Sequence, residues 1–220
     1  MPEIFRVGVA GRGNVGAATV NLLRDQAALL RLRSKREIKV TAVSARSKEK
    51  DRGFSMDNLQ WYDDPISLVK DDRIDVIVET IGGSEGVAAE LVEKAITGGK
   101  HVVTANKALI AESGISLAEK AEEFGVILAF EAAVAGGIPI VKAIREGLSA
   151  NKIDGVYGIL NGTCNYILTC MRETGMEFEV VLKEAQELGY AETDPSFDVD
   201  GIDTAHTLAI LSSLAFGKRI

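Results

Sequence analysis

A glycine pattern near the N-terminus constrains the fold of this 220-residue chain more than any other feature. A short apolar run over 4–10 leads into G-x-G-x-x-G at 11–16, and a helical pattern follows over 17–32. This order of strand, glycine turn and helix is the setting of the dinucleotide fingerprint. The first glycine allows the tight turn, the second lets backbone approach a pyrophosphate, and the third lets the helix pack on the strand. The helix start would face the phosphates. The predicted cofactor residues here are Gly11, Gly13, Asn14, Val15 and Gly16.

The pattern that follows predicts an α/β fold with a doubly wound parallel Rossmann sheet. Unbroken apolar runs alternate with helical stretches, as in a parallel sheet covered on both faces. The predicted strands are 38–43, 75–79, 101–104 and 125–130, and the predicted helices between the later strands are 86–97 and 113–124. Ligands of such sheets bind at the carboxyl ends of the strands. Thr80 and Lys107, which follow two of these strands, are therefore candidate site residues.

The alternation ends near residue 135, where the chain reads G-G-I-P. We predict a dinucleotide-binding domain at 1–135 and part of a second, α+β substrate domain at 136–220. The elements predicted for the second domain are helix 140–148, strand 152–160, helices 165–173 and 178–188, an acid-rich loop over 189–203, and a final helix ending at Phe216 with Gly217 as its cap.

Composition narrows the classes of partner. The net charge of −7 argues against nucleic acid or an anionic membrane as the main partner. The acidic excess falls in 131–220, which suits a cationic group on a substrate or a bound metal. Cys164 and Cys170 are too few for a disulfide scaffold, and we expect reduced thiols in a cytoplasmic protein. No signal peptide is visible, and no apolar run approaches the roughly 20 residues of a membrane helix, so we expect a soluble protein.

The end of the second predicted strand bears on the cofactor. NAD-binding folds place an acidic residue there for the ribose hydroxyls, but residues 43–48 read V-S-A-R-S-K. Arg46 can form a charge-assisted fork with a 2′-phosphate, assisted by Ser47 or Lys48. The alternative is a solvated basic surface, because 31–52 holds nine basic residues. The prediction favours NADP over NAD.

Five segments together resemble homoserine dehydrogenases, in the order of that family and over nearly the whole chain. They are 11–16, T-A-N-K at 104–107, E-A-A-V-A-G-G-I-P at 131–139, N-G-T-C-N-Y-I-L at 161–168, and 189–203. The resemblance implies interconversion of homoserine and aspartate 4-semialdehyde with NAD(P), on the route to threonine, methionine and isoleucine.

The resemblance also implies residue roles. Lys107 would lie beside the nicotinamide and the reacting oxygen, where a lysine of lowered pKa can move the hydroxyl proton. Glu192 and Asp198 would belong to the substrate pocket, and Asp203 would assist catalysis or hold the amino group. The alternatives are an exposed lysine at a helix start and a solvated acidic loop that also includes Asp194 and Asp200. Glu131, with backbone groups of Val134, Gly136 and Ile138, resembles the family's sodium-type site; the alternative is a carboxylate that caps nearby N–H groups.

Three other side chains have plainer interpretations. Cys164 is expected to be a small packed residue and not a nucleophile. His206 is expected to be a satisfied surface histidine, and His101 to open a strand.

Two departures from the family pattern qualify the resemblance. The pattern Asp-x-x-x-Lys, one helical turn long, ends here in Thr207, and a hydroxyl cannot replace a titratable ammonium. The family's substrate region also continues well past residue 220, through much of a sheet used for homo-oligomer formation. Two alternatives therefore stay open: a catalytically inactive dinucleotide-binding fragment, and another nicotinamide-dependent amino-acid dehydrogenase.

Overall fold

The computed structural model describes residues 3–219 except 12, 48–52 and 54. The chain divides into two compact units, Met1–Ile140 and Val141–Ile220, each of which is described by itself. The predicted domain boundary after residue 135 stays a prediction. Among the described residues, no helix combines the length and the apolarity needed to cross a membrane.

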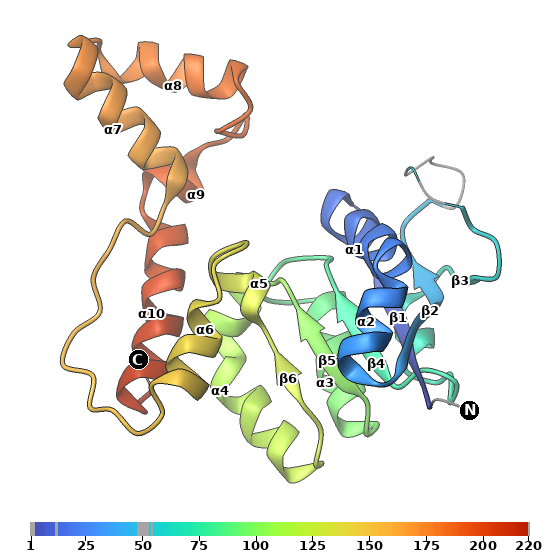
Figure 1. The fold of residues 1–220 in the computed structure, drawn as a ribbon. Coiled ribbons are helices and arrows are strands. Elements are labelled where there is room, and N and C mark those ends of the chain that lie inside the picture. The colour runs from blue at the N-terminus through green and yellow to red at the C-terminus, as the bar shows by residue number, and fades with distance from the viewer. Residues whose placement is uncertain (1–2, 12, 48–52, 54, 220) are drawn as a thin grey trace. The chain divides into compact units, whose positions relative to one another are not determined.

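The first unit is built on a six-stranded sheet in the order β3-β2-β1-β4-β5-β6, in which every neighbouring pair is parallel (Figure 1). This arrangement confirms the predicted doubly wound parallel sheet. The strand order reverses between β1 and β4, and the carboxyl ends at such a switch point form the usual ligand crevice. The strands are β1 (Ile4–Ala10), β2 (Glu37–Ser44), β3 (Gln60–Tyr62), β4 (Val76–Glu79), β5 (His101–Thr104) and β6 (Leu128–Ala129).

Helices flank this sheet, and valines supply much of the core between them. The helices are α1 (Asn14–Asp25), α2 (Ala27–Ser34), the 3₁₀ turn η1 (Pro65–Leu68), α3 (Val87–Thr97), α4 (Lys107–Glu123) and α5 (Glu131–Val134). Val20 of α1 packs fully buried against Val7, Val9, Val40, Val43 and Val76 of the strands. Burial of these branched side chains, at roughly 1.5–3 kcal/mol each, fixes α1 on the sheet.

Three details differ from the prediction for the first unit. The single helix predicted over 17–32 is interrupted at Gln26, which has non-helical dihedral angles and separates α1 from α2. Helix α4 begins at Lys107, six residues before the predicted start. The last strand is limited to Leu128–Ala129, because Gly125 adopts φ 65° and belongs to the turn that ends α4.

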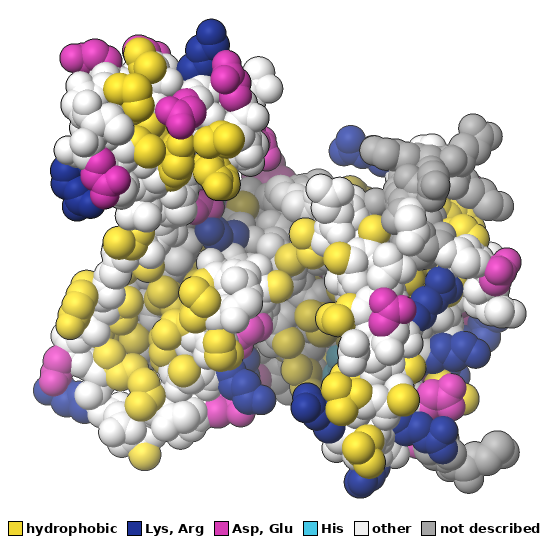
Figure 2. Space-filling model, turned by 45° about the horizontal axis from the view of Figure 1, so that its top comes forward, with side chains coloured by type: hydrophobic (Ala, Val, Ile, Leu, Met, Phe, Trp, Pro, Cys, Tyr) yellow, Lys and Arg dark blue, Asp and Glu magenta, His cyan; other side chains and the backbone are white. Residues whose placement is uncertain are grey.

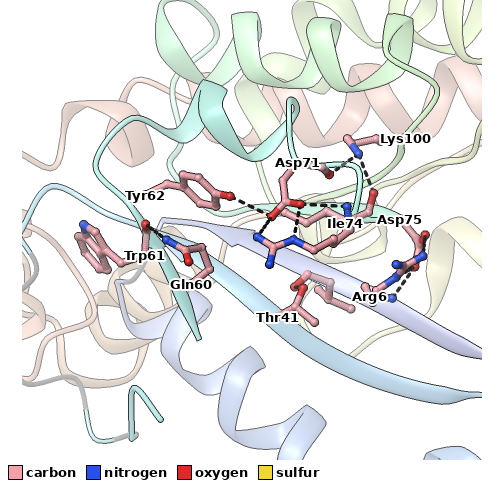
Figure 3. A network of polar contacts seen from close by, with 11 residues as sticks. Arg6, Thr41, Gln60, Trp61, Tyr62, Asp71, Ile74, Asp75 and Lys100 are labelled. Atoms are coloured by element: carbon pink, nitrogen blue, oxygen red, sulfur yellow. Dashed lines mark hydrogen bonds and ion pairs between the residues drawn. The ribbon is translucent and has the colours of Figure 1, made fainter. Parts of the chain in front are cut away.

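A polar network fixes the segment before β4 at the amino ends of the strands (Figure 3). The Asp75 carboxylate accepts both side-chain bonds of Arg6 at 3.0 Å, and the buried Lys100 Nζ donates to the carbonyls of Asp71 and Ile74 at 2.9 and 2.7 Å. Hydrogen bonds from Arg73 lower the pKa of Asp71 to about 2. This network lies at the end of β1 opposite to the glycine turn, so its role is to hold the sheet together.

The second unit is helical in its described residues. After α6 (Ile140–Lys142), which crosses the division between the units, it contains the π-helical turn η2 (Ala143–Gly147), α7 (Gly162–Thr174), α8 (Phe178–Glu187), α9 (Ser196–Val199) and α10 (Ile202–Phe216). Ile167 of α7 packs with Val181 and Ala185 of α8 in a small core. The predicted helices are confirmed, as is the cap at Gly217, where φ is 61°. Helix α9 lies inside the predicted acid-rich loop.

The strand predicted over 152–160 is wrong. The segment has no regular secondary structure, and its Tyr157 and Ile159 side chains are 95% and 77% exposed. A strand needs a neighbour to satisfy its backbone groups, and none of the described segments pairs with this one. Apolar side chains are exposed elsewhere on both units as well (Figure 2).

Candidate functional site

The glycine turn between β1 and α1 is tightly packed at Gly11 and Gly16 and open at Gly13. Gly11 adopts φ 90°, and its N–H donates to the Ser44 carbonyl at 3.0 Å. A Cβ on Gly16 would lie 1.9 Å from the Gly11 carbonyl oxygen, whereas a Cβ on Gly13 would meet nothing within 4 Å. Gly11 and Gly16 are therefore required by internal packing, while Gly13 faces space that a ligand can enter. Asn14 and Val15 form the exposed first turn of α1 beside it.

Thr80 supports this turn from β4. Its hydroxyl donates to the Gly11 carbonyl at 2.7 Å and lies 3.1 Å from that of Ala10, and its N–H donates to Ala10 at 2.8 Å. The hydroxyl is thus used to hold the glycine turn. Contact between Thr80 and a cofactor stays a prediction.

A pocket of about 560 Å³ opens beside the turn, at the carboxyl ends of β1 and β2. Its lining residues are Gly11, Gly13, Ser44, Ala45, Arg46, Ser47, Asp63, Pro65, Thr80, Ile81 and Val87. The structure therefore brings Arg46 and Ser47 to the predicted location, whereas Lys48 lies outside the described residues. The first turn of α1 contains no acidic residue, so the partial positive charge of its N-terminus is not opposed there.

Asp63 is a member of this pocket that the sequence did not reveal. It follows β3, and its carboxylate accepts the Trp61 indole N–H at 2.6 Å. The NAD fingerprint points to an acid at the end of β2, and the three-residue β3 is too short to give a periodic signal that would single out Asp63. The pocket thus contains both a cationic side chain, Arg46, and a carboxylate, Asp63.

Glu79 is a fully buried carboxylate at the end of β4, and it organises the neighbouring loops. Its Oε1 accepts the N–H groups of Ile81 and Gly82 at 2.6 and 3.0 Å, and its Oε2 accepts the Thr104 hydroxyl at 2.5 Å. Burial of a carboxylate is costly unless its oxygens are hydrogen-bonded. These three bonds therefore tie the loop after β4 to the end of β5.

Asn106 extends the same network to the start of α4. Its N–H donates to the Thr104 hydroxyl at 2.9 Å, and its amide Nδ2 donates to the Gly83 carbonyl at 2.7 Å. Its Oδ1 caps α4 by accepting the Leu109 N–H at 3.1 Å. Lys107 is the first residue of this capped helix and is half-buried, so the buried network determines where its backbone lies.

In the second unit, one amide brings two predicted carboxylates together. The Asn161 Nδ2 donates to Oδ1 of Asp198 at 2.8 Å and to Oδ2 of Asp203 at 3.0 Å. Asp198 belongs to α9, and Asp203 to the first turn of α10. Asn161 lies in a segment that carries the family resemblance, and the sequence indicates no role for it in the site. An asparagine before a helical pattern indicates a helix cap in the sequence. The sequence does not indicate that its amide also binds two carboxylates.

The other acidic side chains of this region do not join the pair. Glu192 lies in the exposed connection between α8 and α9, where its carbonyl accepts the Gln186 side-chain amide at 3.0 Å. Asp194 accepts bonds from Ser196 at the start of α9, and these bonds lower its pKa. Asp200 ends α9. A substrate contact of Glu192 stays a prediction.

Thr207 is enclosed one helical turn after Asp203. Its side chain is buried, and its hydroxyl donates to the Asp203 carbonyl at 3.0 Å. His206 is half-buried and lies edge-on to Phe197, with ring centroids 5.5 Å apart. The Nδ1 atom of His206 is buried and has no hydrogen-bond partner among the described residues, so the expected satisfied surface histidine is wrong.

The other two interpretations agree with the structure. Burial, with the charges of Asp198 and Asp203, raises the pKa of the Cys164 thiol, and Sγ donates to the Asp198 carbonyl at 3.2 Å. A raised pKa disfavours the nucleophilic thiolate. His101 opens β5 as predicted, and its Nδ1 accepts the Ile127 N–H at 3.0 Å.

The predicted cation ligands lie close together in sequence, on α5 and the turn after it. Glu131 begins α5, Val134 ends it, and Ile138 donates its N–H to the Ala135 carbonyl at 3.0 Å, with Gly136 in the intervening turn. Within the described ranges, no group of three or more His, Cys, Asp or Glu side chains could hold a metal. A site of one carboxylate and several backbone carbonyls is of another kind, so it stays a prediction.

Comparisons with known proteins agree on one family. The model described as the NAD-binding domain of homoserine dehydrogenase matches residues 11–131, and the model described as homoserine dehydrogenase matches 139–220. The homoserine dehydrogenase of Pseudomonas aeruginosa is 54% identical over 96% of this chain, and that of Neisseria gonorrhoeae is 51% identical over 96%. The chain covers 48% of each, so it spans about half the length of these relatives.

Solved structures give the same result. The homoserine dehydrogenase from Thiobacillus denitrificans is 50% identical with a TM-score of 0.92, over 99% of this chain and 50% of that one. A hyperthermophilic archaeal homoserine dehydrogenase in complex with NADPH is 27% identical with a TM-score of 0.86, over 98% of this chain and 71% of that one. With both family models matched in order along the sequence, the chain belongs to the homoserine dehydrogenase family.

Proposed function

We propose that this chain carries the nucleotide-binding part and a portion of the substrate-binding part of an NADP-dependent homoserine dehydrogenase. Such an enzyme interconverts homoserine and aspartate 4-semialdehyde, on the route to threonine, methionine and isoleucine. The observation that carries the proposal is the pair formed by Asp198 and Asp203, because two adjoining carboxylates suit the ammonium group of a small amino acid. The pocket beside the open Gly13 supplies the place for the dinucleotide.

The residues of each unit have separate tasks in this proposal. The N–H groups at the start of α1 would bind the diphosphate, and Lys107 would hold or move the proton at the reacting oxygen. Asp198 and Asp203 would orient the amino group, with Glu192 as a further contact. A bound nicotinamide supplies the hydride chemistry itself.

The preference for NADP rests on Arg46, whose guanidinium can bind a 2′-phosphate in a bidentate manner. The archaeal relative that was solved with NADPH supports the same choice. Asp63 opposes it, because a carboxylate in the same pocket favours free ribose hydroxyls. We propose that Arg46 has the larger effect.

Two further proposals follow from the family resemblance, and a third, the location, follows from the low cysteine content. A sodium-type cation would bind Glu131 and the backbone of Val134, Gly136 and Ile138, whose oxygens are the ligands that hard cations prefer. The protein would act in the cytoplasm. The whole protein would be a homo-oligomer, formed through a dimerisation region like that of the family.

One observation favours the alternative of a dinucleotide-binding chain without catalysis. Thr207 stands where the family pattern has lysine, and its hydroxyl is already committed to the Asp203 carbonyl. Loss of a positioned acid or base typically lowers the rate by about 10²–10⁴-fold.

The test compares wild type, Thr207→Lys and Thr207→Met. Methionine gives a long uncharged side chain at the same buried position, so it controls for packing. NADPH oxidation by aspartate semialdehyde is expected to be weak in wild type and to rise at least about tenfold in the lysine variant only. NADPH binding with no turnover in any variant would favour the inactive dinucleotide-binding fragment. Absence of NADPH binding would reject both that alternative and the NADP-dependent dehydrogenase.

A further inference from the structure

Asn161 has every strong hydrogen-bonding group of its amide in use. The side chain is 9% exposed, and the Oδ1 atom accepts the Cys164 N–H at 2.8 Å while Nδ2 donates to Asp198 and Asp203. A flipped amide would set its oxygen against two carboxylates and its NH₂ against an N–H donor. The surrounding groups therefore permit one orientation of the amide.

The bridge is neutral, and this determines what it can do for the two carboxylates. Two anions that share a region repel each other unless a donor holds them. An arginine or lysine at this position would hold Asp198 and Asp203 but would cancel one of their charges. The Asn161 amide holds one oxygen of each carboxylate and leaves the charge of the pair intact. The bridge itself therefore neutralises neither carboxylate.

Asn161 also connects three helices, two of which carry the pair. It is the N-cap of α7, and its partners lie on α9 and at the start of α10. The Cys164 thiol adds a second link from α7 to the carbonyl of Asp198 at 3.2 Å. A side chain that binds both acids and caps a third helix sets the spacing of the two carboxylates.

We propose that Asn161 is a positioning residue, which holds Asp198 and Asp203 as one anionic pair for the ammonium group of the amino-acid substrate. This inference rests on the proposed function for the identity of the ligand. The juxtaposition of the three side chains is a separate claim and can be tested without substrate.

The first experiment examines that juxtaposition by NMR of the ¹⁵N-labelled chain. The side-chain amide protons of Asn161, assigned by their loss in Asn161→Ser, are expected to exchange with water at least about tenfold more slowly than those of exposed Asn151. In Asp198→Asn and Asp203→Asn, the exchange should accelerate. Exchange of the Asn161 protons at the rate of Asn151 would overturn the bridge.

The second experiment separates positioning from helix capping. Serine is as good an N-cap as asparagine, but it is too short to bridge the carboxylates, whereas alanine removes both roles. Asn161→Ser keeps the cap but loses both bonds to the carboxylates, so it is expected to unfold at a lower urea concentration than wild type and at a higher one than Asn161→Ala. By calorimetry on the NADP-saturated chain, both variants should bind homoserine at least about tenfold more weakly, because bonds to charged groups are the stronger ones. NADPH affinity should stay within about twofold, since the glycine turn belongs to the other unit.

The outcomes are distinguishable. Homoserine binding by Asn161→Ser at the wild-type affinity would overturn the positioning role while leaving the proposed function intact. Failure of wild type to bind homoserine would reject the proposed substrate, and the exchange experiment alone would then decide whether Asn161 holds the carboxylate pair.

Discussion

Replacing each of two glycines in the same turn by alanine is predicted to impair different properties. Gly16→Ala should lower stability, and Gly13→Ala should lower the affinity for NADPH. A Cβ on Gly16 would lie 1.9 Å from the Gly11 carbonyl oxygen and 2.8 Å from Oγ1 of Thr80. The first distance is more than an ångström too short, and the atom it meets is backbone. A Cβ on Gly13 has no neighbour within 4 Å, and the φ of −70° at this position is accessible to alanine.

The expected magnitudes follow from these contacts. Overpacking costs about 1–3 kcal/mol, and more where backbone must move, while alanine regains about 1 kcal/mol of helix propensity. Gly16→Ala should therefore lower the free energy of unfolding by about 2 kcal/mol or more. At Gly13, alanine is a poorer helix cap, but it also lowers the conformational entropy of the unfolded chain. Because these two effects oppose each other, stability should change by less than about 0.5 kcal/mol. The added methyl group would instead stand where the diphosphate approaches, and NADPH should bind at least about tenfold more weakly.

The assay uses the protein's own fluorophore. Trp61 is the only tryptophan, and its fluorescence during urea unfolding reports on the first unit. NADPH titrations give the affinities. Gly13→Ala with wild-type NADPH affinity would show that the cofactor does not approach this backbone, and wild-type stability of Gly16→Ala would refute the packing argument.

Three other predictions concern charges and hydroxyls of the first unit. Asp71 has a pKa lowered to about 2, so its ion pair stabilises the protein above pH 4 and the effect is lost as the pH falls towards 2; Asp71→Asn should cost about 1–2 kcal/mol at pH 6 and visibly less at pH 3 in urea unfolding. Thr104→Val should cost about 1–3 kcal/mol because it leaves a buried carboxylate and a backbone N–H without their partner, whereas Thr104→Ser, which keeps the hydroxyl, should cost less than half as much. Arg46→Ala should lower the ratio of NADPH to NADH affinity at least about tenfold, and Asp63→Asn should raise it; fluorescence titrations that show no change in the ratio would contradict the roles of both residues.

The fold of the first unit could be predicted because most residues of its central strands are buried or half-buried. Apolar runs such as 76–78 are distinctive, and the glycine turn fixes where the first helix begins. Short or exposed elements gave no such signal. Strand β3 has three residues, and the apolar residues of 152–160 predict a strand although no described segment pairs with them. A strand-like sequence pattern shows that a segment can form a strand, but the segment does so only where a neighbouring strand pairs with its backbone.

The candidate site was predictable as a set of residue types but not as a set of contacts. Lys107 and Asp203 are candidates because they lie in segments with a family resemblance, and Lys107 also because it follows a predicted strand. The residues that orient the site, Glu79 and Asn161, bind partners 25 to 42 positions away, and no local period connects them. The one local sign was the capping position of Asn161, which indicates a helix start and says nothing of its second role.

Glu79 and Asn161 have the same physical role in their respective units, which is to hold neighbouring groups in place by hydrogen bonds. Residues that bind a charged ligand must keep some hydrogen-bonding capacity for it, so they cannot also be fixed by saturating their own groups. A buried neighbour whose groups are fully used can fix them instead. Glu79 does so through Thr104 for the backbone at the start of α4, and Asn161 does so directly for Asp198 and Asp203. It follows that substitutions at these two positions should alter ligand binding without any contact to the ligand, and that a cap-preserving change such as Asn161→Ser should do so with a smaller loss of stability than Asn161→Ala.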